Sequence, residues 1–447
     1  MTPAVRGRAI DVHADETTTR RRFLQAGAAL ALASSPSVAA ALPPPITGEG
    51  ADGAPGALRK GISLSGPAPV RSGRHPNDYR YWGTPDYFRR SGTTWVKLWV
   101  SWDDFQPDYR PRSRAESWFD FNMAPLGQAW MWRLDRQIKA ANDDGLGVIL
   151  SLYHAFPRWA SGAEGDDPDS QRGASQRLPR DLSSDGPWGW WVSYLCARYS
   201  GQTNPLGPHE PFPGEGAPGY DARSGNPAGA RVDALEVCNE PNVLVWPQQG
   251  IAASVATMIR SAVALAGPAG PRILAPSTLD SPDPGEAAAP RVRTDWRTFT
   301  TQVLADLRRE PAPGPFAWSH HNYRDVKRAV AARQSRVFQV ADLVRRSSWP
   351  EEGRPLLWLT EAGLNIFPNP GDPRVRRLQA ERIRRNFLEM GRVPDVYLWT
   401  QHGLSDVDAN LFKSGLRDDF QQGDDPRPGR ARPALRAWGE LPGAPEP

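Results

Sequence analysis

The chain alternates short apolar runs with longer helix-like stretches over residues 60–440, and this alternation restricts its fold more than any other feature. About eight of the short runs have the length and composition of strands, and the longer stretches carry apolar residues at helical spacing. Repeated strand–helix units predict a parallel sheet, and eight of them predict a closed barrel. We therefore expect an α/β protein with one large (β/α)8 barrel, and a doubly wound open sheet is the alternative.

The predicted strands are Gly61–Leu64, Thr94–Ser101, Leu146–Tyr153, Ala234–Cys238, Arg272–Ala275, Phe316–His320, Leu356–Leu359 and Asp395–Thr400. The predicted helices are Trp130–Asn142, Trp188–Tyr199, Ile251–Ala266, Thr298–Arg308, Phe338–Arg346 and Arg377–Met390.

Three of the predicted loops are long. Those at Ser161–Pro187 and Asp280–Asp295 follow the third and fifth strands, so we expect them at the C-terminal face of the barrel, where such folds carry out their chemistry. The loop Gly201–Arg231 precedes the fourth strand and is expected on the opposite face, with no catalytic role.

Residues 1–41 have the pattern of a twin-arginine export signal. The basic segment Thr19–Gln25 is followed by the apolar segment Ala26–Ala33 and then by small residues through Ala41. The alternative is an arginine-rich tail before an Ala-rich helix. The signal predicts a protein that meets the twin-arginine export machinery and is secreted or held in the periplasm or cell envelope. Residues 42–58 are predicted to be a linker, residues 59–440 the catalytic domain and residues 441–447 a tail.

Charge and cysteine content exclude several classes of function. The 54 basic and 50 acidic residues leave a net charge of +4, without the clustered basic face that nucleic-acid binding requires. No segment after the signal has the roughly 18 unbroken apolar residues of a membrane span. The two cysteines, Cys196 and Cys238, are expected on different elements as buried free thiols.

Two glutamates, Glu240 and Glu361, each follow a short apolar run and come directly before a Pro or an Ala-Gly pair that ends it. If both runs are strands of one parallel barrel, both carboxylates lie at its C-terminal mouth. Paired carboxylates at a mouth lined with aromatic residues suit cleavage of a glycosidic bond.

The segment Asn239-Glu240-Pro241-Asn242, at the end of the fourth predicted strand, resembles the signature of clan A retaining glycoside hydrolases. With Glu236 three residues before Asn239, it is most similar to family 39 and its neighbours, including family 5. Further segments resemble other parts of these barrels in the same order along the chain: Val96–Trp102 with Phe105–Pro107, His154–Ser161, Trp318–Tyr323, Thr360–Gly363 and Trp399.

This resemblance implies a role for each glutamate. Glu361 would be the nucleophile, giving a covalent glycosyl-enzyme, and Glu240 would be the general acid and then the general base. Asn239 would bind the sugar 2-hydroxyl. Each residue also has a structural alternative. For either glutamate it is a structural carboxylate at a strand end, and for Asn239 it is a side chain that satisfies loop backbone groups.

The remaining candidates line the predicted site. Tyr323 is the candidate donor to Glu361, and His321 would orient either that tyrosine or Glu240. Trp399 would offer a flat floor for a pyranose ring. His154 is a candidate substrate contact, although for both histidines a hydrogen-bonded position in the wall is an equal alternative. His320 should point away from His321 because side chains alternate along a strand.

The second predicted strand departs from the family pattern. Clan A enzymes commonly have an arginine there that holds the nucleophile, whereas this chain has Lys97. Depending on register, either Lys97 or no basic residue takes the place of that arginine, and in the second case Lys97 pairs with Glu236 inside the barrel. A lysine lacks the bidentate fork of arginine.

The resemblance thus implies an exported retaining glycoside hydrolase that acts on an oligo- or polysaccharide. We expect no cofactor and no metal site, since no His/Cys cluster has ligand spacing. A barrel that has lost turnover and binds carbohydrate is the alternative. A hydrolase of ester or peptide bonds is disfavoured, because no serine-centred nucleophile motif is present.

Overall fold

A computed structural model describes residues 58–64, 78–80, 83–106, 110–123, 125–201, 229–286, 293–347, 356–406, 412–419 and 428–443. The predicted export signal, most of the predicted linker, most of the loop Gly201–Arg231 and residues 444–447 lie outside these ranges. The chain divides into two units, Met1–Glu49 and Gly50–Pro447. Only the second contains described residues.

The second unit is built on a parallel sheet that closes on itself. Its strands pair in the order β5-β4-β3-β2-β1-β9-β8-β7-β6, and every pair is parallel. Their bounds are β1 Arg59–Ser63, β2 Trp95–Val100, β3 Gly147–Leu152, β4 Ala234–Glu236, β5 Arg272–Leu274, β6 Thr278–Leu279, β7 Trp318–His321, β8 Leu357–Ala362 and β9 Val396–His402.

The two ends of this sheet meet at the fifth strand of the barrel. Leu274 at the end of β5 bridges Ala317, which directly precedes β7, and the backbone N–H of Ala275 donates to the Ala317 carbonyl at 2.7 Å. β5 and β6 are therefore two parts of one barrel strand, interrupted where Pro276 has no N–H to give to the ladder. The closed (β/α)8 barrel is confirmed, and the open-sheet alternative is wrong.

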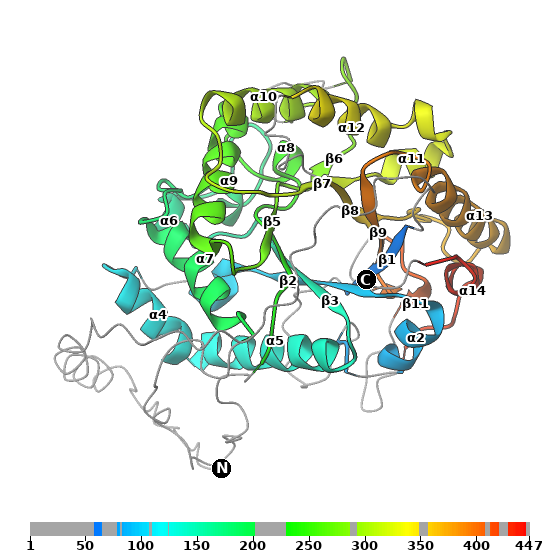
Figure 1. Cartoon of the computed structure of the whole chain (residues 1–447), viewed down its shortest axis with the longest axis horizontal. Helices are drawn as coiled ribbons and strands as arrows, with labels where there is room; N and C mark the ends of the chain where they lie inside the picture. The colour runs from blue at the N-terminus through cyan, green and yellow to red at the C-terminus, as the bar shows by residue number, and fades with distance from the viewer. Residues whose placement is uncertain are drawn as a thin grey trace, which may run out of the picture. The chain divides into compact units, whose positions relative to one another are not determined.

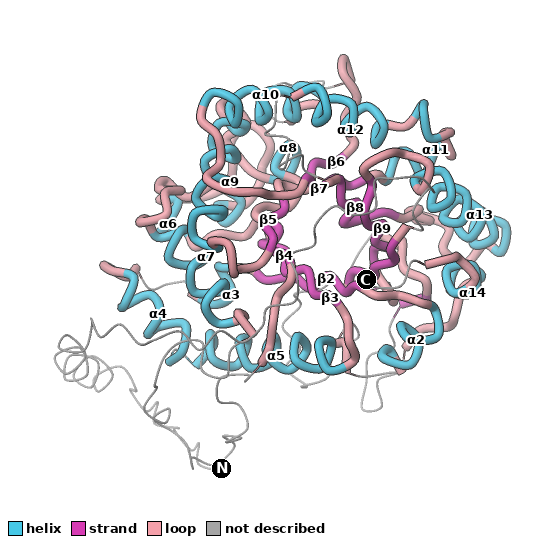
Figure 2. The backbone as a smooth tube through the Cα atoms, in the orientation of Figure 1, coloured by secondary structure: helices cyan, strands magenta, loops and turns pink. Residues whose placement is uncertain are grey.

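Helices surround the strands as a ring (Figure 1 and Figure 2). The long helices between successive strands are α2 Thr84–Ser91, α5 Pro125–Asp143, α7 Pro187–Arg198, α9 Ile251–Ala266, α10 Trp296–Arg309, α12 Arg336–Arg346 and α13 Pro373–Met390. The remaining described helices are α3 Trp102–Phe105, α4 Arg114–Met123, α6 Arg158–Ser161, α8 Pro241–Leu244, α11 Tyr323–Arg328 and α14 Pro433–Gly439.

All the predicted strands and helices are found, and the bounds of α9 are those expected. Side-chain caps set several helix starts: the carboxylate of Asp295 accepts the N–H of Thr298 at 2.9 Å, and Ser335 caps α12 in the same way. The short strand pair β10 Ser405–Asp406 and β11 Arg417–Asp419 was not predicted. Two or three residues carry too little periodicity to mark a strand.

Both cysteines are buried and free, as predicted. Burial raises the pKa of the Cys196 thiol to about 12. Among the described residues, no helix has the length and apolar character needed to cross a membrane.

Candidate active site

Glu240 is held at the mouth of the barrel by an unusual backbone. Its N–H donates to the carbonyl of Ser277 at 3.0 Å, which ties the end of the fourth strand to the fifth. Its φ of 45° and ψ of 50° lie in the left-handed region, and Pro241 then begins α8. Few residues other than glycine adopt this region, and those that do are concentrated at functional sites.

Glu361 is positioned by a β-bulge in β8. Leu359 pairs with Trp399 and Ala362 with Gln401, so β8 has one more residue than β9 over this stretch. The extra residue lets Thr360 and Glu361 both reach the barrel interior: the Thr360 hydroxyl bonds to Glu236, and Glu361 bonds to Lys97. Bulges of this kind re-aim side chains next to active sites.

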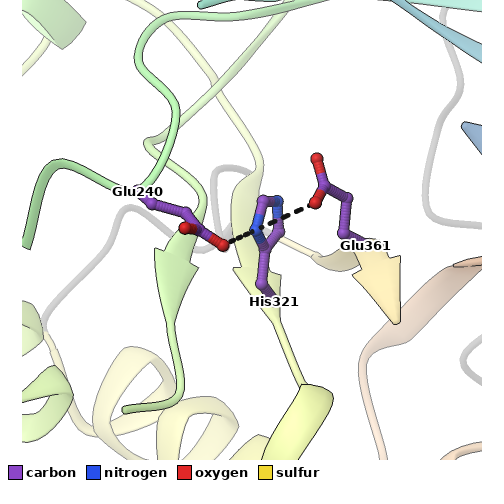
Figure 3. Close-up of side chains that lie close together, drawn as sticks. All are labelled: Glu240, His321 and Glu361. Atoms are coloured by element: carbon purple, nitrogen blue, oxygen red, sulfur yellow. Dashed lines mark hydrogen bonds and ion pairs between the residues drawn. The ribbon is translucent and has the colours of Figure 1, made fainter. Parts of the chain in front are cut away.

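The two glutamates meet across His321, as Figure 3 shows. His321 Nδ1 lies 2.8 Å from Glu240 Oε1 and 3.6 Å from Glu361 Oε2. A carboxylate oxygen of each glutamate and a ring nitrogen of His321 all lie within 4.8 Å of one another. His320 turns the other way, toward the ring of Trp296 in the helix layer, as strand alternation predicts.

Lys97 lies under this pair with no exposed surface. Its Nζ contacts Glu361 Oε1 at 2.9 Å and Glu236 Oε2 at 2.6 Å, so it fulfils both of the predicted alternatives at once. Burial opposes its charge, but the two carboxylates outweigh burial and raise the pKa of Lys97. Its Nζ also lies 4.4 Å from the ring centre of Trp99.

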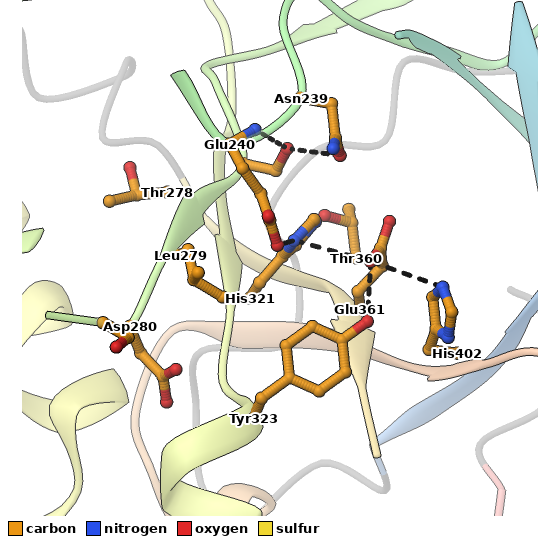
Figure 4. A network of polar contacts seen from close by, with 12 residues as sticks. Asn239, Glu240, Thr278, Leu279, Asp280, His321, Tyr323, Thr360, Glu361 and His402 are labelled. Atoms are coloured by element: carbon orange, nitrogen blue, oxygen red, sulfur yellow. Dashed lines mark hydrogen bonds and ion pairs between the residues drawn. The ribbon is translucent and has the colours of Figure 1, made fainter. Parts of the chain in front are cut away.

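Tyr323 and His402 both lie close to the Glu361 carboxylate (Figure 4). The Tyr323 hydroxyl donates to Glu361 Oε2 at 2.7 Å, as predicted. His402 Nε2 lies 3.9 Å from the same oxygen, and its Nδ1 is 2.7 Å from the hydroxyl of Ser414. His402 was not predicted, but its place two residues after Thr400 on one strand face is a parity signal that could have indicated it.

The surroundings shift the pKa values of Glu240 and His321 in opposite directions. Burial and the nearby charge of Glu361 raise the pKa of Glu240 well above its usual value. Burial and Lys97 hold the pKa of His321 well below its usual value, so the imidazole is neutral. Its Nε2 lies 3.5 Å from the donor-only ammonium of Lys97, which places its single proton on Nδ1, facing Glu240.

Asn239 and His154 are both buried, but their side chains have different neighbours. Asn239 is buried beside Glu240, and its side-chain oxygen accepts the hydroxyl of Ser277 at 3.4 Å. His154 is buried with its ring 3.9 Å from that of Tyr153, and burial lowers its pKa to about 3. Burial, together with the charges of Glu240 and Glu361, raises the pKa of Tyr153 to about 12.

The predicted role of Trp399 is wrong. The side chain is fully buried on the outer side of β9, where its indole N–H donates to the Asn386 side chain on α13 at 2.8 Å. Its ring centre lies 5.4 Å from that of Trp438 on α14. Strand alternation gives the inner side to Thr400 and His402, so Trp399 packs the helix layer and cannot form the floor of a sugar site.

We expect Trp399→Phe to lower the free energy of unfolding by about 1–3 kcal/mol, because it removes a buried hydrogen bond and part of a packed ring. The Michaelis constant for substrate should not change. Urea unfolding combined with steady-state kinetics checks both values. A raised Michaelis constant at unchanged stability would restore the stacking role.

Two loops of the mouth rest on the segment that follows Glu240. The loop after β3 joins it through a bridge between Arg177 and Trp246 and through Arg172 Nη1, which donates to the carbonyl of Val243 at 3.2 Å. The loop after β6 joins it through Asn242, whose amide donates to the carbonyls of Leu279 at 3.1 Å and Thr294 at 3.3 Å. The two predicted mouth loops thus lie beside Glu240 and Glu361. The loop Asp280–Asp295 is described except at residues 287–292.

Glu240, His321 and Glu361 form the one group of potential metal-ligating side chains found among the described residues. Lys97 already contacts two of these three residues with a positive charge. A second cation in the same space would be repelled by this ammonium.

Fold and site together define the class: a (β/α)8 barrel with a buried pair of carboxylates at its C-terminal mouth, the arrangement of many glycoside hydrolases. No family model matches the chain, and no curated protein matches it.

Solved structures similar to this chain include glycoside hydrolases of three families. A family 39 glycoside hydrolase from Bacteroides cellulosilyticus WH2 is 12% identical over 88% of this chain, with a TM-score of 0.49. A GH5_18 protein from Streptomyces cattleya, in complex with GlcNAc, is 18% identical over 88% of this chain and 82% of its own, with a TM-score of 0.45. A GH30 endoxylanase from Clostridium papyrosolvens C71 is 12% identical over 78% of this chain and 65% of its own, with a TM-score of 0.44.

The present chain spans 64% of the length of the family 39 protein. At these identities and scores, we take the fold from the strand pairing and the function from the geometry of the site.

Proposed function

We propose that this protein is a glycoside hydrolase that cleaves O-glycosidic bonds with retention of configuration. The observation that carries the proposal is the approach of Glu240 and Glu361, with carboxylate oxygens within 4.8 Å of each other at the barrel mouth. Retaining enzymes hold their carboxyls about 5–5.5 Å apart for direct attack, whereas inverting enzymes leave about 6.5–9.5 Å for a water.

In the first step, Glu361 attacks the anomeric carbon while the bond to the leaving group breaks and Glu240 gives its proton to the departing oxygen. The raised pKa of Glu240 keeps that proton available above the usual range of a carboxylic acid. Lys97 and Tyr323 both donate to the Glu361 carboxylate, which orients it and favours the charged form that attacks.

In the second step, water attacks the anomeric carbon, Glu240 accepts its proton, and the bonding electron pair of the ester returns to Glu361. The Nδ1–H of His321 faces Glu240 at 2.8 Å and stabilises its carboxylate in this basic form. Asn239, beside Glu240, is the proposed partner of the sugar 2-hydroxyl. Tyr153, Trp99 and His402 are candidate walls of the same sugar site.

The alternative of a carbohydrate-binding barrel without turnover was suggested by the lysine in place of an arginine. Lys97 nevertheless reaches Glu361 at 2.9 Å, the contact a supporting cation must make. The geometry therefore favours the enzyme.

Labelling with a panel of 2-fluoro glycosyl fluorides tests the proposal. These reagents form the glycosyl-enzyme and slow its hydrolysis, so intact-mass measurement should show one added sugar, located on Glu361 by peptide mapping. A binding protein would take up no label from any sugar of the panel, whereas label on another residue would displace Glu361 from the role.

The acid role of Glu240 predicts a specific pH dependence. Its pKa is raised, so the protonated form persists above the usual range of a carboxylic acid and is lost as pH rises through that raised pKa. The value of kcat/KM should therefore fall on the alkaline side. In Glu240→Gln, assayed on an activated aryl glycoside from about pH 4 to pH 10, this limb should be absent. An unchanged limb would assign it to another group.

We also propose export through the twin-arginine machinery, on the basis of residues 1–41 alone. Replacing Arg21 and Arg22 with lysine should retain the protein inside the cell, which fractionation and blotting would show.

A further inference from the structure

The barrel interior beneath the catalytic pair holds another carboxylate, Glu236, for which the proposed reaction has no direct use. It lies on β4 four residues before Glu240 and is fully buried. Donors from four other strands converge on it: Lys97 Nζ of β2 at 2.6 Å, Ser151 Oγ of β3 at 2.6 Å, Thr360 Oγ1 of β8 at 2.6 Å, and Ser319 Oγ of β7.

These donors make Glu236 a permanent anion. Burial opposes its ionisation, but Lys97 and the hydroxyl groups outweigh burial and lower its pKa. It lies below the cleft, with the Lys97 ammonium between it and Glu361, so it does not touch a substrate at the mouth. Its contact with Glu361 is made through Lys97, and at longer range its charge also favours the protonated form of Glu240.

Lys97 has two carboxylate partners in the resting enzyme, Glu236 and Glu361. The other titratable groups that act on it are His321, at 3.5 Å, and the more distant His402 and Glu240. Both histidines have lowered pKa values and the pKa of Glu240 is raised, so the surroundings favour the uncharged form of all three. Among the described residues, Glu236 and Glu361 are therefore the two carboxylates in contact that balance the charge of this buried ammonium.

That balance changes during the proposed reaction. In the glycosyl-enzyme, Glu361 is an uncharged ester, so Glu236 is the one anion left in contact with Lys97. A buried ammonium without an anionic partner tends to lose its proton. A neutral amine could not stabilise the negative charge that returns to Glu361 when water attacks the anomeric carbon.

We propose that Glu236 is a positioning residue that keeps Lys97 protonated in the glycosyl-enzyme and thereby sets the rate of its hydrolysis. This inference rests on the proposed function. The step itself is the second one given above: water adds to the anomeric carbon, its proton passes to Glu240, and the ester bond breaks with the electron pair returning to Glu361.

The test follows the hydrolysis of the 2-fluoro glycosyl-enzyme after removal of excess reagent. In Glu236→Gln we expect hydrolysis about ten-fold slower than in the wild type near pH 8, with the difference shrinking as the pH is lowered toward about 6. The sign follows from Lys97: without Glu236 its pKa in the intermediate is lowered, so its proton is lost as pH rises.

A matched control separates charge from packing. Asp135→Asn removes one carboxylate from another buried ion pair, that with Arg198 at 2.5 Å on the outer helices. It should cost stability in the same way while keeping the wild-type pH dependence of hydrolysis. A Glu236→Gln variant with that same pH dependence would overturn the inference.

A second comparison serves if Glu236→Gln fails to fold. Lys97→Met and the double variant Lys97→Met/Glu236→Gln should hydrolyse the intermediate at rates equal within about three-fold, since Glu236 acts through Lys97. A larger difference would contradict the inference. If the wild type takes up no label, the proposed function itself fails; if only these variants disagree, the role of Glu236 fails alone.

Discussion

Replacing Glu361 with glutamine should lower kcat by at least about four orders of magnitude, the largest effect expected of any single substitution in this chain. The amide cannot attack the anomeric carbon to form the ester. Its NH2 group would also face donors, because Lys97 and Tyr323 both direct hydrogen atoms at this side chain. Steady-state hydrolysis of an activated aryl glycoside measures the loss.

Glu310→Gln is the matched control for this substitution, since Glu310 follows α10 at the surface with a side chain that is 68% exposed. It should leave kcat and stability at their wild-type values. Thermal unfolding of Glu361→Gln should show a folded protein. A loss below about a hundred-fold would mean that Glu361 is not the nucleophile.

Glu240→Ala should give the second largest effect, and its size should depend on the leaving group. Glycosides with poor leaving groups need the proton of Glu240, so their kcat/KM should fall by about three to four orders of magnitude. Activated aryl glycosides leave without protonation and should lose far less in the first step. A plot of log kcat/KM against leaving-group pKa measures the difference.

Azide provides the complementary measurement on Glu240→Ala. With the base gone, water attacks the glycosyl-enzyme slowly, whereas azide needs no base and fits the space left by the side chain. We expect azide to raise kcat and to yield a glycosyl azide with the configuration of the substrate. Equal losses on all leaving groups, or a product of inverted configuration, would contradict the assigned role of Glu240.

The buried network gives Lys97 two carboxylate partners on the strand where the family resemblance implies an arginine. An arginine holds a carboxylate with a bidentate fork, whereas Lys97 makes a single contact with Glu361 and a second with Glu236. The second carboxylate replaces the missing geometric restraint by fixing the ammonium from the opposite side. An arginine would make two hydrogen bonds to one carboxylate, whereas Lys97 makes one contact with Glu361 and one with Glu236.

Local pattern was enough to obtain the barrel and the meeting of its two glutamates. Apolar runs of strand length, separated by amphipathic stretches, admit few arrangements other than a parallel sheet. Glu240 and Glu361 each follow such a run, and the C-terminal ends of parallel strands lie on one face of a barrel. The contact of Tyr323 with Glu361 was expected from the family resemblance rather than from local pattern.

The bulge in β8, the faces of β9 and the contacts of Lys97 depend on how distant strands pair, which no local sequence pattern encodes. The bulge at Thr360 and Glu361 appears only when β8 is compared with β7 and β9. The register of β9 places His402 in the site and Trp399 outside it, since a shift of one residue exchanges the two faces of a strand. Lys97 reaches Glu236 and Glu361 because closure of the sheet brings β2, β4 and β8 around one interior, where long-range packing rather than neighbouring residues decides which side chains touch.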